Sequence, residues 1–259
     1  MCSRERRFIL TISEPTGRFT ILYQDDNYVA IHKPSGIMVH RTAASGERAV
    51  VLQKLRNQIG GNIFPLHRLD RPTSGVLIFG KSPAAAGALA GAFREHRVAK
   101  LYLALVRGYV DEAGTIDKPL REGPGAPERS SLTRFTRLAT IELPIRVNRY
   151  PSTRYSLVAA QPQTGRFHQI RKHFASIRHP LLGDSAHGDG RHNRFFREHF
   201  QIHRLHLVAL KLGFFHPYQK KWLEVTTEPD AELLRLYEIF GWDWQALSAA
   251  LPKYTSNAG

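Results

Sequence analysis

The sequence predicts an α+β protein, with flanking helices and loops on a large mixed, mainly antiparallel sheet. Two observations lead to this prediction. Strand-like runs and helical stripes follow one another irregularly, without the regular strand–helix–strand repeat of a parallel sheet. The chain has 259 residues, of which 42% are hydrophobic, enough to fill one large core. One domain is therefore expected over residues 19–259.

The first quarter of the chain predicts an extension, two strands and a helix. Residues 1–18 carry no clear pattern, and we expect a weakly ordered extension. Residues 19–23 and 28–31 are typical of strands joined by a polar turn, and a Lys-Pro-Ser-Gly turn at 33–36 ends the second strand. Residues 49–59 place their apolar side chains on one helical stripe.

The next segment predicts a strand, a helix, a strand and a loop. Residues 76–79 form a short apolar run, and Ser82-Pro83 provides the N-cap and first turn of a helix that extends to about His96. Residues 100–106 alternate as a strand does. The Gly/Pro-rich stretch 121–131 predicts a loop, but its flanks are alike in composition, so it does not divide the chain into domains.

The remainder predicts two strands, two helices and a flexible segment. Strands are expected over 154–160 and 205–215, and a helix over 167–177. The polar stretch 183–197 is expected to be flexible, and Pro229 starts a last helix. Trp242 and Trp244 are expected to close the core.

The charge of the chain indicates a polyanionic partner. Lys and Arg number 37 against 22 acidic residues, a formal net charge of +15. Solubility alone is usually reached with a smaller net charge, and more effectively with acidic residues, so nucleic acid is the favoured partner. Surface arginines such as Arg191, Arg194 and Arg197 are candidates for choosing the target.

Cysteine use and the first residues point to the cytoplasm. Cys2 is the one cysteine, which excludes an internal disulfide and a paired-cysteine zinc site, and fits a reducing compartment. Residues 1–10 carry four charges and no long apolar run, unlike a signal peptide or membrane anchor. We therefore expect a cytoplasmic protein without a membrane association.

The first candidate site is a carboxylate between two arginines, in His67-Arg68-Leu69-Asp70-Arg71. Pro72 and Gly75 predict a turn just before an apolar strand. Nearby positive charge favours the ionised form of an aspartate, which suits a nucleophile or a base better than a general acid. A salt-bridged turn aspartate without catalytic use is the more common explanation from spacing alone.

A second basic cluster covers residues 164–173. On a helix its apolar side chains form a stripe that continues to Ile177, with Arg171 at the edge. From there Arg171 could reach a buried carboxylate and pair with it through two hydrogen bonds. The alternative is a solvated basic face, which accounts for Lys172 and Arg178.

The sequence contains no recognisable metal or nucleotide-cofactor motif. Histidines gather between residues 187 and 206, but there is no His-Glu-x-x-His motif and no carboxylate at a suitable spacing, and surface histidines beside arginines suit RNA contact as well. No Gly-rich stretch follows a predicted strand as a phosphate-binding loop does. Neither a metal nor a cofactor such as ATP or NAD is expected.

Several stretches together resemble the RluA-type pseudouridine synthases. Residues 67–75 resemble the family's HRLDxxTSG motif, and further matching blocks follow in family order at 33–36, 100–102, 164–171 and 179–184. Within the family, residues 39–41, 149–155 and 183–189 are most similar to the tRNA pseudouridine(65) synthases. Two departures stand out: the loop at 121–131 looks short, and Val208 replaces a histidine common among relatives.

The resemblance implies a fold, an activity and a set of site residues. It implies the pseudouridine synthase fold with the active-site cleft across the sheet, no separate S4-type RNA-binding module and no cofactor. Asp70 is then the catalytic carboxylate, Arg171 its salt-bridge partner, Tyr102 the ring that packs on uracil, and Arg68 the residue that fills the stack left by the flipped uridine. The further implied RNA-binding residues are Lys33, His67, Arg71, Arg166, Gln169 and Lys172.

The implied substrate is a uridine at position 65 of tRNA, with ribosomal RNA as the alternative. A monomer without an obligatory protein partner is expected. Two other functions remain open: a non-catalytic RNA-binding protein that has kept the fold, and a hydrolase with Asp70 as nucleophile, for which a second carboxylate is missing at a recognisable position.

Overall fold

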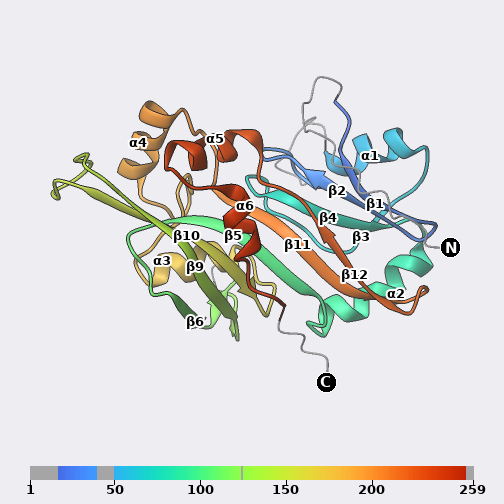
Figure 1. Cartoon of the computed structure of the whole chain (residues 1–259). Coiled ribbons are helices and arrows are strands. Elements are labelled where there is room, and N and C mark those ends of the chain that lie inside the picture. The colour runs from blue at the N-terminus through green and yellow to red at the C-terminus, as the bar shows by residue number, and fades with distance from the viewer. Residues whose placement is uncertain (1–16, 40–49, 124, 255–259) are drawn as a thin grey trace.

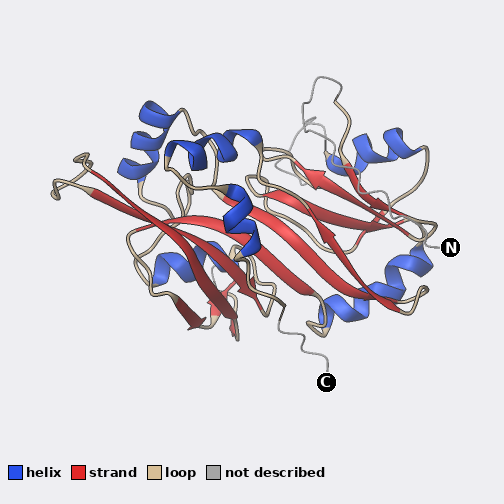
Figure 2. Ribbon diagram, in the orientation of Figure 1, coloured by secondary structure: helices blue, strands red, loops and turns tan. Residues whose placement is uncertain are grey.

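A ten-stranded mixed sheet forms the centre of the molecule in the computed structural model, which describes residues 17–39, 50–123 and 125–254 (Figures 1 and 2). The strands run in the order β1-β2-β4-β11-β5-β10-β9-β6, with β12 paired to β11 and β3 to β4. They are β1 (Ile21–Gln24), β2 (Tyr28–Lys33), β3 (Phe64–Pro65), β4 (Ser74–Gly80), β5 (Ala99–Arg107), β6 (Ala113–Asp117), β9 (Leu132–Leu143), β10 (Thr153–Pro162), β11 (Leu207–His216) and β12 (Lys221–Thr226). The two-residue strands β7 (Leu120–Arg121) and β8 (Glu128–Arg129) form a separate ribbon.

The strand β11 lies between β4 and β5, although β4 and β5 follow one another along the chain. It pairs with β5 antiparallel and with β4 parallel, with Val208 opposite Ser74. The other strand pairs are antiparallel. A strand from the last quarter of the chain therefore sets the separation between two strands from its first half.

Helices cover both faces of the sheet (Figure 2). They are α1 (Val51–Ile59), α2 (Pro83–Arg94), α3 (Gln169–Ser176), α4 (Gly190–Phe200), α5 (Ala231–Ile239) and α6 (Trp244–Ala249). On one face, α1 and α3 each pack on a hydrophobic cluster, and the side chain of Tyr102 contacts both clusters. On the other face, α2 packs on one cluster and α4, α5 and α6 share another. Alternate residues of β11 supply the two faces, as strand geometry requires.

The predicted fold class and the predicted strands and early helices are confirmed. Each of the six predicted strands falls on an observed strand, and the helix begun by Ser82 is α2, where the Ser82 hydroxyl accepts a hydrogen bond from the Ala85 N–H. The helix predicted over 49–59 is α1, and the one over 167–177 is the shorter α3. Trp242 and Trp244 pack against the core as expected.

Two predictions for the last third of the chain are wrong. The stretch 183–197 is not a flexible segment, because residues from Gly190 onward form α4. The Asp189 carboxylate caps this helix, and Phe196 and Phe200 bury its apolar side in the core. The helix after Pro229 is not the last one either, since α6 follows it with Asp243 as its N-cap.

Three strands, β6, β9 and β12, were not predicted from the sequence. Their residues do not alternate regularly between polar and apolar side chains, and many of them are partly or fully exposed, so the pattern typical of a strand is weak. The predicted loop 121–131 is confirmed in its centre, but its ends pair as β7 and β8. The predicted extension 1–18 falls, except for Gly17 and Arg18, outside the described residues. No helix within the described residues is long and apolar enough to cross a membrane.

Candidate active site

Asp70 lies in a turn that enters β4 where that strand meets β11. The Thr73 N–H donates to the Asp70 carbonyl oxygen across 3.0 Å, which closes the turn. Gly75 has a φ of +113°, and a Cβ atom there would lie 2.2 Å from the Ala209 carbonyl oxygen. Only glycine fits this backbone conformation and this close approach. The Asp70 carboxylate is held at the cavity with 19% of its side chain exposed.

Lys33 stabilises this turn from inside the protein and does not contact solvent. Its side chain is fully buried, and its ammonium donates to the carbonyl oxygens of Pro34, Ile37 and Arg71 at 2.9–3.2 Å. The Gly36 N–H also donates to the Arg71 carbonyl oxygen. Burial, more than repulsion from Arg204, lowers the pKa of Lys33 to about 7. The predicted RNA-binding role of Lys33 is therefore wrong, because its donors are used inside the protein.

Arg171 connects Asp70 to a second, buried carboxylate. Its Nε and Nη2 each donate to Asp184 across 2.7 Å, and its Nη1 donates to Asp70 Oδ2 across 3.2 Å. The contact with Asp70 agrees with the predicted pairing. The contact through two hydrogen bonds that the sequence predicted for Arg171 is made with Asp184. Asp184 is the last residue of the 179–184 stretch, and no role was predicted for it.

Asp184 is placed to hold Arg171 in one orientation. It also accepts hydrogen bonds from the backbone N–H groups of Ala186 and His187. Burial raises the pKa of Asp184, but the hydrogen bonds from Arg171 and His187 more than offset it, and the net pKa lies below its usual value. Both oxygens of this carboxylate are thus satisfied, and the guanidinium keeps one edge for Asp70.

Tyr102 comes from β5 and lines the same cavity as Asp70. Burial first, and the negative charge of Asp70 second, raise the pKa of the Tyr102 hydroxyl far above its usual value. The hydroxyl therefore stays protonated at neutral pH and cannot serve as a base. Its ring offers a flat apolar surface beside the carboxylate.

The cavity that contains Asp70 has a volume of about 720 Å³. Of the predicted site residues, it is lined by His67, Arg68, Asp70, Tyr102, Arg166, Gln169 and Arg171. Lys33, Arg71 and Lys172 do not line it. Val208 belongs to the cluster on the opposite face of the sheet, whereas the loop after β7 reaches the cavity through Glu122. The short loop therefore does contribute to the site.

Two predicted RNA-binding residues have structural roles. His67 accepts a hydrogen bond from the Ile78 N–H and stacks on Phe93, and burial lowers its pKa to about 3. Gln169 is buried and makes hydrogen bonds to four groups, two of them on β9. A neutral histidine and a fully bonded amide thus stabilise the cavity walls, and direct RNA contact by either residue stays a prediction.

The remaining predicted RNA-binding residues keep free donors. Arg71, Arg166 and Lys172 each donate one hydrogen bond to a backbone carbonyl oxygen. Arg68 is exposed at the cavity edge and makes no hydrogen bond or ion pair to any described residue. These four side chains are available to an anionic ligand.

His168 and Lys100 are cavity residues that the sequence analysis left without a role. The Nε2 atom of His168 lies 3.6 Å from Asp70 Oδ2, and its Nδ1 lies 2.9 Å from His187 Nε2. Burial, partly offset by Asp70, lowers the pKa of His168 to about 4. Lys100 donates to the Thr164 carbonyl oxygen, and burial lowers its pKa to about 8. Lys100 and His168 lie inside the stretches 100–102 and 164–171, which resemble family motifs. Membership of these stretches was the sequence signal that could have identified both residues.

Two histidines of the 187–206 group lie in the core, not at an RNA-contacting surface. His192 Nδ1 lies 2.8 Å from the Tyr155 hydroxyl, and His206 Nε2 lies 2.7 Å from the Tyr237 hydroxyl. Among the described residues, no group of three or more histidine, cysteine or acidic side chains is arranged to hold a metal ion.

Comparisons with known proteins agree on one family. The family model described as RNA pseudouridylate synthase matches residues 27–176. A protein named tRNA pseudouridine synthase C from Vibrio cholerae serotype O1 is 45% identical over 233 residues, which covers 86% of this chain and 96% of that protein. One of the same name from Salmonella typhi is 43% identical over 234 residues, covering 86% of this chain and 90% of that protein. The solved structure of Human RNA Pseudouridylate Synthase Domain Containing 1 is similar with a TM-score of 0.67 and 25% identity, covering 94% of this chain and all of that one.

Proposed function

Since the chain belongs to the RNA pseudouridylate synthase family, we propose that it isomerises a uridine of tRNA to pseudouridine with Asp70 as the catalytic carboxylate. The observation that carries the assignment of Asp70 is its place in a cavity beside Tyr102, with Arg171 oriented toward it by a buried Asp184. An oriented guanidinium beside a carboxylate stabilises the anion that each possible reaction route needs.

The reaction exchanges one bond of the nucleoside for another. The N1–C1′ bond breaks, the uracil ring turns, and a C5–C1′ bond forms; C5 loses a proton and N1 gains one, so the product is an isomer of uridine. Asp70 can attack C1′, add to the uracil ring or take a proton from C2′. All three routes use the ionised carboxylate and none needs an external electron or group donor.

Tyr102 and Arg68 are proposed to handle the uracil and the gap it leaves. The target base must leave its stack before its glycosidic bond can be reached. The Tyr102 ring then packs against the uracil, and its protonated hydroxyl does not compete with Asp70 as a base. Arg68, exposed and without a partner among the described residues, has the planar group that stacks on bases and can fill the vacated position.

The tRNA substrate is supported by the names of the two relatives described above, both called tRNA pseudouridine synthase C. We propose position 65 as the target, from the resemblance of residues 39–41, 149–155 and 183–189 to the position-65 enzymes. Mapping pseudouridine in total RNA from cells with and without the gene tests this. Loss of the modification at tRNA position 65 is expected, whereas an unchanged tRNA with a lost ribosomal RNA site would contradict the proposal.

The role of Asp70 is tested with Asp70→Asn, which keeps the size of the side chain and removes its charge. We expect product formation to fall by about 10³-fold or more while tRNA affinity stays within a few-fold of the wild type. Pseudouridine is counted by mass spectrometry, and affinity by filter binding. Full activity of the variant would remove Asp70 from the mechanism, and absence of pseudouridine with the wild type would favour a non-catalytic RNA-binding protein.

A further inference from the structure

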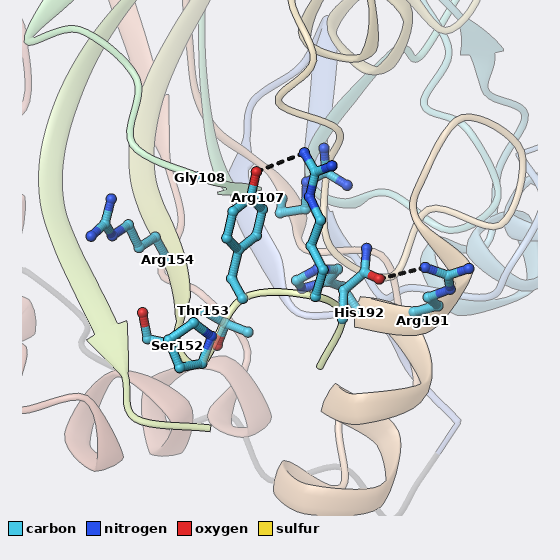
Figure 3. Close-up of a pocket in the computed structure, with 11 residues that line it drawn as sticks. Arg107, Gly108, Ser152, Thr153, Arg154, Arg191 and His192 are labelled. Carbon is cyan, nitrogen blue, oxygen red and sulfur yellow. Dashed lines mark hydrogen bonds between the residues drawn. The ribbon is translucent and has the colours of Figure 1, made fainter. Parts of the chain in front are cut away.

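A second cavity, of about 690 Å³, lies between the loop that joins β9 to β10 and the start of α4 (Figure 3). It shares no lining residue with the cavity at Asp70. In Figure 1 the β9–β10 loop projects at the end of the sheet away from α1 and α2. The proposed chemistry at Asp70 therefore does not account for this cavity.

Four arginines and no acidic residue line this second cavity. Arg107 is paired with Asp189, and Arg154 with Glu142. The other two donate to neutral oxygens: Arg149 to the Tyr150 hydroxyl, and Arg191 to the Asn148 amide, both across 2.6 Å. Two positive charges at the cavity wall are thus left without a carboxylate partner. Figure 3 shows Arg154 and Arg191 on opposite sides of the hollow.

Further unpaired arginines extend the positive surface along α4. Arg194 and Arg197 follow Arg191 at intervals of three residues, on neighbouring positions of the helix surface, and all three are exposed. Arg194 and Arg197 make no ion pair to a described residue. A further hollow is lined by Arg191, Arg194 and Arg197 together with two carboxylates, which are already paired: Asp184 with Arg171 and Asp189 with Arg107.

Tyr150 adds a flat side chain to this charged surface. It is 58% exposed, and the Arg149 guanidinium lies 4.7 Å from its ring centre. An exposed aromatic ring beside arginines is a common arrangement for contact with a nucleotide, because the ring can stack while the arginines bind phosphate. We call Arg149, Tyr150, Arg191, Arg194 and Arg197 the arginine surface.

We propose that the arginine surface binds the sugar-phosphate backbone of a helical arm of the tRNA, away from the target uridine. This inference rests on the proposed function. Arginine forks match phosphate oxygens in pairs, and backbone contacts of this kind position an RNA without reading its sequence. The surface lacks the apolar centre of a protein interface, so a folded protein partner fits it less well.

One loop ties the arginine surface to the site at Asp70. Within residues 183–189, Asp184 holds Arg171, His187 contacts His168, and Asp189 both caps α4 and pairs with Arg107. The separation between the two sites is therefore set by a short segment bonded at both ends. An RNA arm seated on the arginine surface would place the target nucleotide at a fixed distance.

The test compares Arg149→Gln/Arg191→Gln with Lys220→Gln/Lys221→Gln, which removes the same charge from two exposed residues where the turn after β11 enters β12. The probes are full-length tRNA and a stem-loop containing only the target arm. We expect the arginine variant to bind full-length tRNA about tenfold more weakly, with the slope of log affinity against log salt shallower by about 1.5 to 2. Its affinity for the stem-loop and its single-turnover rate at saturating tRNA should match the wild type.

Two results would overturn the inference. One is unchanged affinity and salt slope for full-length tRNA, which would leave the surface to an acidic protein partner or to none. The other is an equal loss in the lysine variant, which would show a general charge effect. A wild type that binds tRNA but forms no pseudouridine would instead refute the proposed function, since the binding comparison does not depend on turnover.

Discussion

The buried ammonium of Lys33 shows why charge in a sequence does not identify a ligand contact. The Lys-Pro-Ser-Gly turn was recognisable, and its lysine was assigned to RNA. The structure gives that ammonium to three carbonyl oxygens, one of them in the Asp70 turn. A sequence alone cannot distinguish these uses, because carbonyl oxygens carry no sequence signal.

A first prediction follows for Lys33→Met, which keeps the length of the side chain and removes its donors. Three carbonyl oxygens would lose the hydrogen bond from the ammonium, although that of Arg71 keeps the one from the Gly36 N–H, and we expect the free energy of unfolding to fall by about 2 to 4 kcal/mol. The turnover rate should fall while tRNA affinity stays unchanged, as measured by urea unfolding, kinetics and filter binding. The exposed Lys221→Met serves as control. Weaker tRNA binding with unchanged stability would instead restore an RNA contact.

The pairing of Arg171 was partly predictable. Its position at the edge of an apolar stripe indicated a buried carboxylate within reach, which the structure confirms. The choice between two carboxylates was not predictable, since it depends on the backbone N–H groups of Ala186 and His187 that fix Asp184. Asp70 receives the remaining edge of the guanidinium.

A second prediction concerns Asp184→Asn. Loss of the charge leaves a buried guanidinium with Asp70 as its single anionic partner, so we expect about 3 kcal/mol of destabilisation, as for breaking a buried ion pair. Because the Arg171 guanidinium would no longer be held in one orientation beside Asp70, the turnover rate should fall more than the affinity for tRNA. Thermal unfolding and single-turnover kinetics measure both, with the exposed Asp111→Asn as reference. A variant with wild-type stability and rate would show that Asp184 does not position Arg171.

A third prediction concerns His206, which is buried. Burial lowers the pKa of this histidine to about 3. Below pH 6.5 the histidine of the unfolded chain takes up a proton, whereas that of the folded chain stays neutral. The stability that the neutral histidine contributes is therefore present above pH 6.5 and is lost as the pH falls toward 3. We expect His206→Gln to flatten the decline of unfolding free energy by up to about 1.4 kcal/mol per pH unit. Urea unfolding at pH 7, 5.5 and 4 measures it, with exposed His199→Gln as control; parallel slopes would contradict the assignment.

At the level of elements, α4 shows where local patterns were insufficient. Its residues 190–200 are rich in Arg and His, a composition that favoured a polar connecting segment. Helix formation depends on the Asp189 cap and on the burial of Phe196 and Phe200 against α5 and the sheet, a tertiary contact. By contrast, α2 was predictable because its cap, Ser82, and Pro83 stand next to each other in the sequence.

A fourth prediction tests the Asp189 cap. Asp189→Ala removes the acceptor of the Arg191 and His192 N–H groups as well as the partner of Arg107, and we expect about 1 to 2 kcal/mol of destabilisation. Asp189→Asn keeps the acceptor at the helix start and should recover most of that loss. Chemical unfolding of the three proteins measures the difference. If both variants were equally destabilised, the ion pair and not the cap would be the main contribution.

At the level of the whole molecule, strand content and face alternation were predictable, and strand order was not. Alternation along residues 205–215 correctly assigned side chains to two faces. Nothing in that stretch indicated that it lies between β4 and β5, because strand neighbours are chosen by contacts distant in sequence. The same insertion determines how Asp70 and Tyr102 come to face one cavity.

The position of β11 has a consequence for biosynthesis. The loop with Asp70 and the strand with Tyr102 leave the ribosome early, but the strand that separates them is made more than a hundred residues later. A fifth prediction is that ribosome-stalled chains ending before residue 207 stay open to protease near Asp70, and that chains long enough to release β11 become protected; early protection would contradict it. Formation of the reactive centre would then await nearly complete translation, so an unfinished chain would carry positive charge but no ability to rearrange a base.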